Sequence, residues 1–444
     1  MKKCTILLLS LVLLMTTSLF AGSLDSLSNL SERFMMTTSR NAATDAADIA
    51  AYNPAGIVFM PKGLHVDLSV QTLLKYYEQK ANMGPSGKSF EQDLPTWALP
   101  NLYVVYNFGD VGPGILGLYF TGGVPAGGGN LDWDGTAGVN AQLAQMGTPY
   151  SSVVASQSFK ASSIYYGIGL GGAYSFLDEK MSVSLGGRLV IARRGFEMSG
   201  AFTGGGLNGM SANVEFDYNA LGFTPILGID VRPIDKLTLA ARYEYTTALK
   251  FKYDEKDISG TGAITAGTLR SILTGVGLED GKKFNQNLPH TIGLGAEYQF
   301  TDAFALSLSG TAYLLNVTNL GKYKDGTNDK DINDLFGIGW EAALGGTYKL
   351  NDSFKFGAGV MYTESGAKDS YFNKQGTLLN ASGNPPLDSI AIGLGAAYSF
   401  NFGLDVNLGM LYSQYLSKDY GFSVLSGTYK KRIIGIGLGL GYHY

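Results

Sequence analysis

Charged residues, proline and cysteine are all scarce in this chain of 444 residues. Charged side chains make up 16% of the sequence, proline occurs 13 times, and cysteine occurs once, at Cys4. A single cysteine excludes an internal disulfide or a thiolate metal cluster. The low proline content argues against a collagen-like or disordered chain. The net charge is −4 without a basic stripe, so nucleic acid is not an expected partner.

Long hydrophobic runs are scarce as well. The run Ile6–Leu14 follows Lys2 and Lys3 and precedes several small residues. This order is typical of a secretory signal peptide, which we assign to residues 1–22. Its removal would take Cys4 with it. After residue 22 no stretch of about 18 apolar residues occurs, which excludes a transmembrane helix.

Glycine and aromatic residues are abundant instead, with 61 glycines, 27 tyrosines and 23 phenylalanines. The end of the chain shows their arrangement, because large residues at even positions of 434–444 alternate with glycines and His443. A period of two places all the large side chains on one face of a strand. A helix would scatter them around its axis. A strand whose bulky face contacts lipid accounts for the pattern.

The same alternation recurs along residues 62–444. We count fourteen runs, at about 62–77, 96–108, 113–124, 161–177, 180–196, 213–231, 236–252, 289–300, 303–316, 335–350, 353–364, 388–400, 403–416 and 429–444. The connections between them are alternately short and long, as in outer-membrane barrels with short periplasmic turns. The sequence therefore predicts an all-β fold, a fourteen-stranded antiparallel transmembrane β-barrel.

Residues 23–61 differ from the rest of the chain. Leu27, Leu30 and Phe34 recur at helical spacing, and an alanine-rich stretch follows them. The segment ends at Asn53-Pro54-Ala55-Gly56, which predicts a turn that stops any helix. Small residues and short helices indicate compact packing inside something larger.

Two arginines are candidate ligand contacts. Alternation places Arg188 and Arg194 on the inner face of one predicted strand. A guanidinium in a partly apolar lumen would hold a carboxylate head group well. The alternative is a structural ion pair with Glu244, Glu341 or the N-terminal segment.

The third run contains a possible opening in the wall. Gly122, Gly123 and Pro125 interrupt its alternation, and such residues weaken a strand ladder. They mark either a bulge that opens the wall or the end of the strand where a long loop begins.

No pattern predicts catalysis, a cofactor or a metal. Residues 167–172 match G-x-G-x-x-G formally, but their large residues alternate as in a strand and no helix follows. Residues 325–334 are rich in Asp and Asn without the spacing of a calcium loop. His65, His290 and His443 are far apart in the sequence. We expect no enzyme, no cofactor and no metal site.

Three stretches of the chain resemble a known family. Ser39–Asp48, leading into Tyr52–Gly56, resembles the N-terminal hatch of FadL-type outer-membrane transporters of long-chain fatty acids. Leu94–Asn101 is similar to the segment that enters the second strand of that family, and Asn287-Leu288-Pro289 is also similar. The resemblance implies that residues 23–61 form a hatch in the lumen of a barrel of residues 62–444. It also implies lateral release of the ligand at a kink in the third strand, where Gly123 falls.

The resemblance sets the expected function. We expect passive, ligand-gated uptake of long-chain fatty acids or similar hydrophobic molecules by a monomer in contact with lipid of the bacterial outer membrane. The alternatives are an aromatic-hydrocarbon channel of the same architecture, a structural or adhesive barrel, and a general porin.

Overall fold

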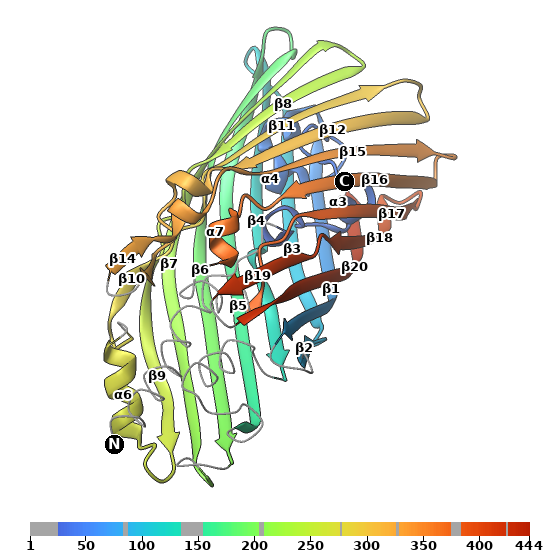
Figure 1. The fold of residues 1–444 in the computed structure, drawn as a ribbon. Coiled ribbons are helices and arrows are strands. Elements are labelled where there is room, and N and C mark those ends of the chain that lie inside the picture. Colours follow the sequence, from blue (N-terminus) through green and yellow to red (C-terminus); the bar gives the residue numbers. More distant parts are fainter. Residues whose placement is uncertain are drawn as a thin grey trace.

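The computed structural model describes residues 25–82, 88–134, 154–203, 208–275, 278–325, 328–373, 383–422 and 425–444. Within them the predicted antiparallel barrel is confirmed (Figure 1). Its fourteen strands are β1 (Gly63–Asn82), β3 (Thr96–Val111), β4 (Gly114–Trp133), β5 (Val154–Phe176), β6 (Met181–Phe202), β7 (Ser211–Ile234), β8 (Leu237–Glu244), β11 (Thr291–Gln299), β12 (Phe304–Tyr313), β15 (Gly339–Lys349), β16 (Phe354–Glu364), β17 (Ser389–Ser399), β18 (Leu404–Tyr415) and β20 (Leu425–His443). The predicted signal peptide lies outside the described residues.

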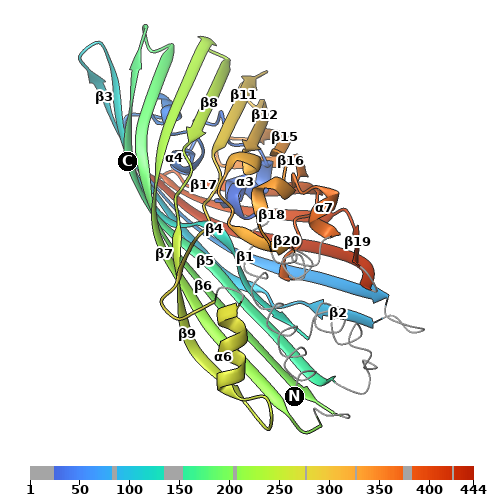
Figure 2. The same cartoon turned by 60° about the vertical axis from the view of Figure 1, so that its left-hand side comes forward.

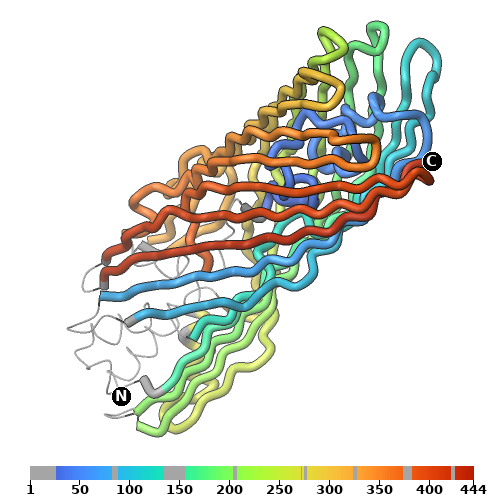
Figure 3. Tube along the Cα trace, turned by 90° about the vertical axis from the view of Figure 1, so that its right-hand side faces the viewer, coloured from blue at the N-terminus to red at the C-terminus, as the bar shows by residue number. Residues whose placement is uncertain are grey.

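The barrel closes between its first and last strands. β1 pairs antiparallel with β20 from His65 opposite His443 to Asn82 opposite Ser426. Figure 3 shows these two strands side by side, blue against red. Closure satisfies the backbone groups of both edges, which lipid could not do.

Shorter elements extend the sheet on the side of the long loops. β2 (Lys88–Gln92), β9 (Lys250–Gly260), β10 (Lys283–Asn285) and β19 (Lys418–Phe422) join the same sheet, and β13 (Lys322–Asp325) pairs with β14 (Asn328–Asp331). The acidic stretch 325–334 belongs to this hairpin and to η6 (Ile332–Leu335), with 326–327 outside the described residues. The remaining short helices on this side are α6 (Ala266–Gly275), η5 (Leu315–Val317) and α7 (Asp369–Phe372).

Several strands are longer than the alternation predicts. β1 continues to Asn82, β4 to Trp133 and β6 to Phe202. Beyond the lipid belt the outer face meets water, so the ladder continues without the apolar alternation that marks it in the sequence. The seventh run is shorter than predicted, because β8 ends at Glu244 and β9 begins only at Lys250.

The N-terminal residues lie inside the barrel. α2 (Asp25–Ser28), α3 (Glu32–Thr37), α4 (Ile49–Tyr52) and η2 (Pro54–Phe59) are surrounded by the strands (Figure 2). Most of their side chains are buried, and we call this segment, residues 25–61, the lumenal segment.

The lumenal segment explains the glycine face of the final strand. A Cβ atom added at Gly437 or Gly439 would collide with the side chain of Glu32. Similar collisions with Thr37 would follow at Gly345 and Gly359. Glycine on the inner face therefore makes room for the helices, while the bulky outer face remains for lipid.

Among the described residues, no helix is both long enough and apolar enough to cross a membrane.

Candidate functional site

The predicted turn at Asn53 joins the lumenal segment to the wall. α4 ends at Asn53, and Pro54 begins η2. The Asn53 side chain accepts a hydrogen bond from the backbone N–H of Ala55 at 3.3 Å and donates one to Oδ1 of Asp230 on β7 at 2.5 Å. The Ala55 carbonyl accepts a hydrogen bond from Ser182 on β6 at 2.8 Å. Gly56 has no room for a side chain, since an added Cβ would lie 2.9 Å from the Ala43 carbonyl oxygen.

Buried ion pairs hold the other end of the lumenal segment. Arg33 bonds Asp67 on β1 and also Glu32, at 3.0 Å. Burial raises the pKa of the Glu32 carboxyl above its usual range, although Arg33 opposes this shift. Buried charges of this kind are costly unless they stay paired, so movement of the segment must preserve or replace these contacts.

A second cluster of ion pairs in the lumenal segment surrounds Arg40. Arg40 bonds Asp48 at 2.5 Å and Asp45 at 2.8 Å, and Asp45 also meets Lys355 of β16 at 2.9 Å. The pair Asp45–Lys355 joins the lumenal segment to the wall, whereas Arg40–Asp48 lies within the segment itself.

The strand pairing of the barrel wall changes at the predicted glycines, but β4 does not end there. The ladder between β3 and β4 stops at Leu102 opposite Gly122, although β3 begins at Thr96 and β4 runs on to Trp133. On its other side β4 shifts register against β5 after Gly123 and again after Ala126. Gly122, Gly123 and Pro125 therefore lie at an interruption within the strand, and the alternative of a strand end is wrong.

The interrupted part of β4 turns toward the lumen. We call residues 123–130 the bend. The ammonium of Lys75, a buried residue of β1, donates a hydrogen bond to the carbonyl of Gly128 at 3.1 Å and another to that of Asn130. Gly127 and Gly129 adopt positive φ values of 113° and 69°, which only glycine adopts readily. The Asn101 side chain accepts the N–H of Val124 at 2.8 Å and so anchors the start of the bend to β3.

Both candidate arginines point inward, as parity predicts. Arg188 makes a two-pronged ion pair with Glu244 of β8, at 3.0 and 2.8 Å, and Arg242 bonds the same carboxylate. Arg194 donates to the Tyr165 hydroxyl and to the Gln286 side chain, and its guanidinium lies 4.5 Å from the centre of the Phe251 ring. The two arginines thus occupy different surroundings, one ionic and one largely aromatic.

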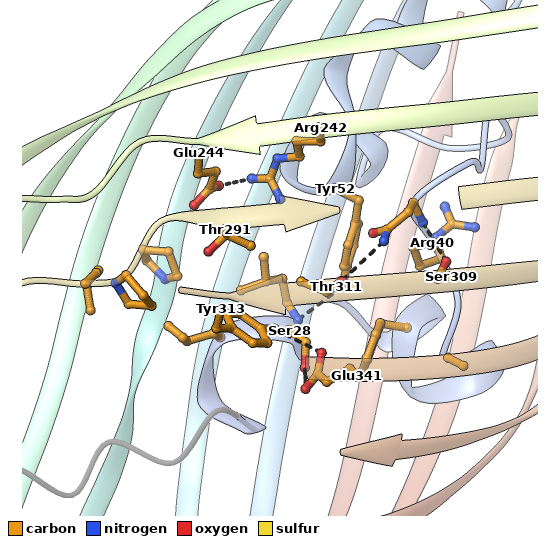
Figure 4. A pocket seen from close by; sticks show the side chains of 18 of the residues that line it. Ser28, Arg40, Tyr52, Arg242, Glu244, Thr291, Ser309, Thr311, Tyr313 and Glu341 are labelled. Carbon is orange, nitrogen blue, oxygen red and sulfur yellow. Dashed lines mark hydrogen bonds and ion pairs between the residues drawn. The ribbon is translucent and has the colours of Figure 1, made fainter. Parts of the chain in front are cut away.

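Two adjoining cavities separate the lumenal segment from the wall. The first, of about 50 Å³, lies among Phe34, Tyr52, Tyr313 and Glu341 (Figure 4). The second, of about 30 Å³, touches Ala50 and Ala51 on one side and Gly122 and Gly123 on the other. Leu30, Pro125, Arg188 and Arg242 line both cavities. Gly122 and Gly123, where the sequence predicts an opening, therefore face the lumenal segment across the second cavity.

Aromatic residues fill the lumen on the long-loop side of these cavities. Phe196 stacks on Phe216 at 4.7 Å, and Tyr218, Tyr253 and Phe284 extend the cluster. Most of these rings are buried. Arg194 therefore lies beside an aromatic cluster on the long-loop side of the lumen.

Sequence reasoning missed Lys75 and its neighbour Lys431. Both are buried on inner faces, and Lys431 donates to the Asn384 side chain at 2.9 Å and lies 4.1 Å from the Tyr415 ring. Their runs contain other lysines that face water, so the residue type alone gave no signal. The alternation of inward and outward positions did carry a signal, because it places Lys75 on the same inner face as Asp67.

The histidines form no metal site in the part of the chain that the structure covers. His65 and His443 come together where the barrel closes, with ring centroids 6.4 Å apart. No group of three His, Cys, Asp or Glu residues among the described residues could hold a metal ion.

Comparison with known proteins places this geometry in a family. The chain is similar to a Pseudomonas aeruginosa FadL homologue at 17% identity, with a TM-score of 0.67 and coverage of 95% of this chain and 99% of that chain. It is also similar to the P. putida toluene transporter TodX, at 12% identity and a TM-score of 0.63 over 94% and 99% of the two chains. These likenesses show a shared fold. A search of curated proteins found no match.

The family itself is shown by sequence. The family model described as outer membrane protein transport protein (OMPP1/FadL/TodX) matches residues 21–426, which is most of the chain. The predicted resemblance is thereby confirmed, and the barrel is placed in a bacterial outer membrane. The chain belongs to the OMPP1/FadL/TodX family of outer membrane transport proteins.

Proposed function

We propose that this protein carries hydrophobic small molecules, foremost long-chain fatty acids, passively across the outer membrane. The ligand would enter the aromatic lumen, pass the lumenal segment and leave sideways between β3 and β4. The observation that carries this proposal is the cavity bounded by the lumenal segment at Ala50 and Ala51 and by the wall at Gly122 and Gly123. A lateral exit suits a fatty tail, which gains about 0.8 kcal/mol per methylene removed from water.

The proposed route is closed in this structure. Cavities of about 50 and 30 Å³ hold a few water molecules at most. Passage of an alkyl chain therefore requires the lumenal segment or the bend to move. We infer that ligand binding supplies this movement, because the sequence contains no pattern for a nucleotide site.

Two inward-facing cations favour a ligand with a carboxylate. Arg194 lies in the aromatic part of the lumen, where it donates to the Tyr165 hydroxyl and contacts the Phe251 ring. Lys75 contacts backbone carbonyls of the bend. A guanidinium or an ammonium binds a carboxylate through charge-assisted hydrogen bonds, which are stronger than hydrogen bonds between neutral groups. Arg188 is the weaker candidate, since Glu244 already provides that bond.

The content of the purified barrel tests the proposal. Mass spectrometry of molecules extracted with the protein in mild detergent should find a fatty acid in near-stoichiometric amount. An empty barrel that also fails to bind added oleate would contradict the proposal. Oleate binding with slow release, measured by fluorescence displacement, would support it.

An aromatic hydrocarbon is the second candidate, favoured by the aromatic lumen and by the fold shared with a toluene transporter. Arg194→Gln distinguishes the two. If the natural ligand is an acid, this change should weaken oleate binding about tenfold, as expected for a lost charged hydrogen bond, and spare toluene. Arg193→Gln is the matched control, because Arg193 is adjacent but faces outward. Unchanged oleate affinity in Arg194→Gln and in Arg188→Gln would contradict the carboxylate assignment.

A further inference from the structure

The outer face of β6 and β7 carries an apolar belt with a sharp upper limit. On β6 the outward residues from Val183 to Ile191 are apolar or glycine. On β7 the exposed residues Leu221, Phe223 and Leu227 continue the belt. The span from Val183 to Ile191 comprises nine residues, within the range of about 9–11 that a tilted strand needs to cross the hydrocarbon core.

The next outward row is cationic. Strand register sets Arg193 of β6 opposite Asn219 of β7, Asn219 opposite Lys252 of β9, and Lys252 opposite Lys283 of β10. Lys250 lies two residues before Lys252, on the side of the apolar belt. We call Arg193, Lys250, Lys252 and Lys283 the cationic row. All four side chains are exposed.

Within the part of the chain that the structure describes, the cationic row has no close anionic partner, although Lys252 interacts electrostatically with Asp254. Among the described residues, none of its four side chains makes an ion pair or a side-chain hydrogen bond. The nearby carboxylates of Asp217 and Asp254 are ion-paired with Lys256, at 3.6 and 2.6 Å. Lys252 and Lys283 lie directly opposite each other on the adjacent strands β9 and β10. Two like charges in this arrangement cost stability unless an anion lies between them.

The surface is hollowed at this place. Arg193, Lys250, Lys252 and Lys283 line a depression of about 920 Å³, and Asp217 lines it as well. Its lower edge is formed by Tyr166 and Leu221 of the apolar belt. A ligand that fills it meets cations above and apolar side chains below. An amphiphile with an anionic head has this polarity.

We propose that the cationic row binds the phosphate groups of an anionic outer-leaflet lipid, with its acyl chains lying along the apolar belt below. The row lies on the side of the long loops, which is the outer side of a barrel with short periplasmic turns. Juxtamembrane Lys and Arg residues attract anionic headgroups in this way. This proposal rests on the membrane placement of the barrel and not on the proposed uptake function.

Native mass spectrometry of the detergent-solubilised barrel tests the proposal with a diphosphorylated glycolipid as probe. The quadruple variant R193Q/K250Q/K252Q/K283Q should bind it at least about tenfold more weakly, because each Lys or Arg near the membrane surface contributes about 1 kcal/mol. The matched control is K80Q/K322Q/K349Q/K418Q, which removes four exposed lysines that are all ion-paired. The control should retain the lipid.

Three results would overturn the proposal. These are equal lipid binding by the quadruple variant, an equal loss in the control, and full competition by inorganic phosphate at the lipid's own concentration. The last result would mean that the row holds free phosphate and gains nothing from acyl chains. Heat-dependent gel mobility confirms that each variant is a folded barrel, so a loss of lipid cannot come from misfolding.

Discussion

At the scale of single residues, one amide connects the lumenal segment to the barrel. The Asn53 side chain caps η2 through Ala55 and reaches Asp230 on β7. Asp230 is itself buried, so its carboxylate depends on this donor. An N-cap bond contributes about 1 kcal/mol, and an unsatisfied buried acceptor costs about 1–3 kcal/mol.

Asn53→Ala should therefore loosen the lumenal segment while the barrel still assembles. We expect altered uptake of labelled oleate and faster proteolysis of the segment, with unchanged heat-dependent gel mobility. Asn351→Ala is the matched control, because Asn351 caps the β15–β16 turn in the same manner at 2.9 Å. Uptake and proteolysis equal to wild type would show that the turn has only a local structural role.

Parity predicted the direction of most inner-face residues but not their partners. Arg188 and Arg194 both face inward as expected, yet only the fold shows that one meets Glu244 and the other Tyr165. These partners lie on other strands, and register between strands depends on loops whose lengths carry little signal.

At the scale of elements, the bend of β4 is held from inside by Lys75. Its ammonium satisfies two carbonyls that have no ladder partner on β3. The lysine therefore acts on the element that we propose as the exit.

Lys75→Met should release the bend. Ala126 is buried in the bend, and the natural chain has no cysteine outside residue 4, so Ala126→Cys gives a clean reporter. We expect the cysteine to react with a maleimide several-fold faster in the Lys75→Met background. Lys80→Met, an exposed change on the same strand, should leave the rate unchanged. Equal rates in all three proteins would show that Lys75 does not restrain the bend.

The element scale also shows where alternation fails. The alternation located every barrel strand, because contact with the lipid belt requires apolar residues at every second position. It wrongly predicted one continuous strand over residues 236–252. There the chain leaves the ladder between β8 and β9, and Thr247 instead bridges to Leu288. Apolar residues continue through this gap, so the pattern survives where the strand does not.

At the scale of the whole molecule, the lumen is occupied. The lumenal segment contacts the wall through Asp45–Lys355 and Arg33–Asp67 as well as through Asn53. A channel filled in this way should pass few ions.

Planar-bilayer recordings of the wild-type barrel should therefore show no sustained large conductance. Deletion of residues 25–60 should produce stable open channels, since the inner-face glycines would then border empty space. A large wild-type conductance would favour the porin alternative and contradict the role of the lumenal segment as a hatch.

For residues 62–444, composition and the two-residue period of large side chains were enough to predict a fourteen-stranded barrel. Small residues and short helices indicated that the lumenal segment packs inside something larger, and the family resemblance placed it in the lumen of the barrel. The bend was located by glycine and proline, but its direction depends on Lys75 and Asn101, which are distant in sequence.

The central claim is lateral exit through the bend, and a comparison of uptake with binding tests it most directly. Gly122→Val adds bulk at the interruption without a collision, and the double change G122V/G123V also pushes against Asn101 of β3. Gly310→Val adds the same bulk to an outward glycine of β12 that has room comparable with Gly122. We predict that both bend variants bind oleate like wild type but take it up several-fold more slowly, while Gly310→Val binds oleate and takes it up like wild type. Wild-type uptake by both folded bend variants would contradict the account.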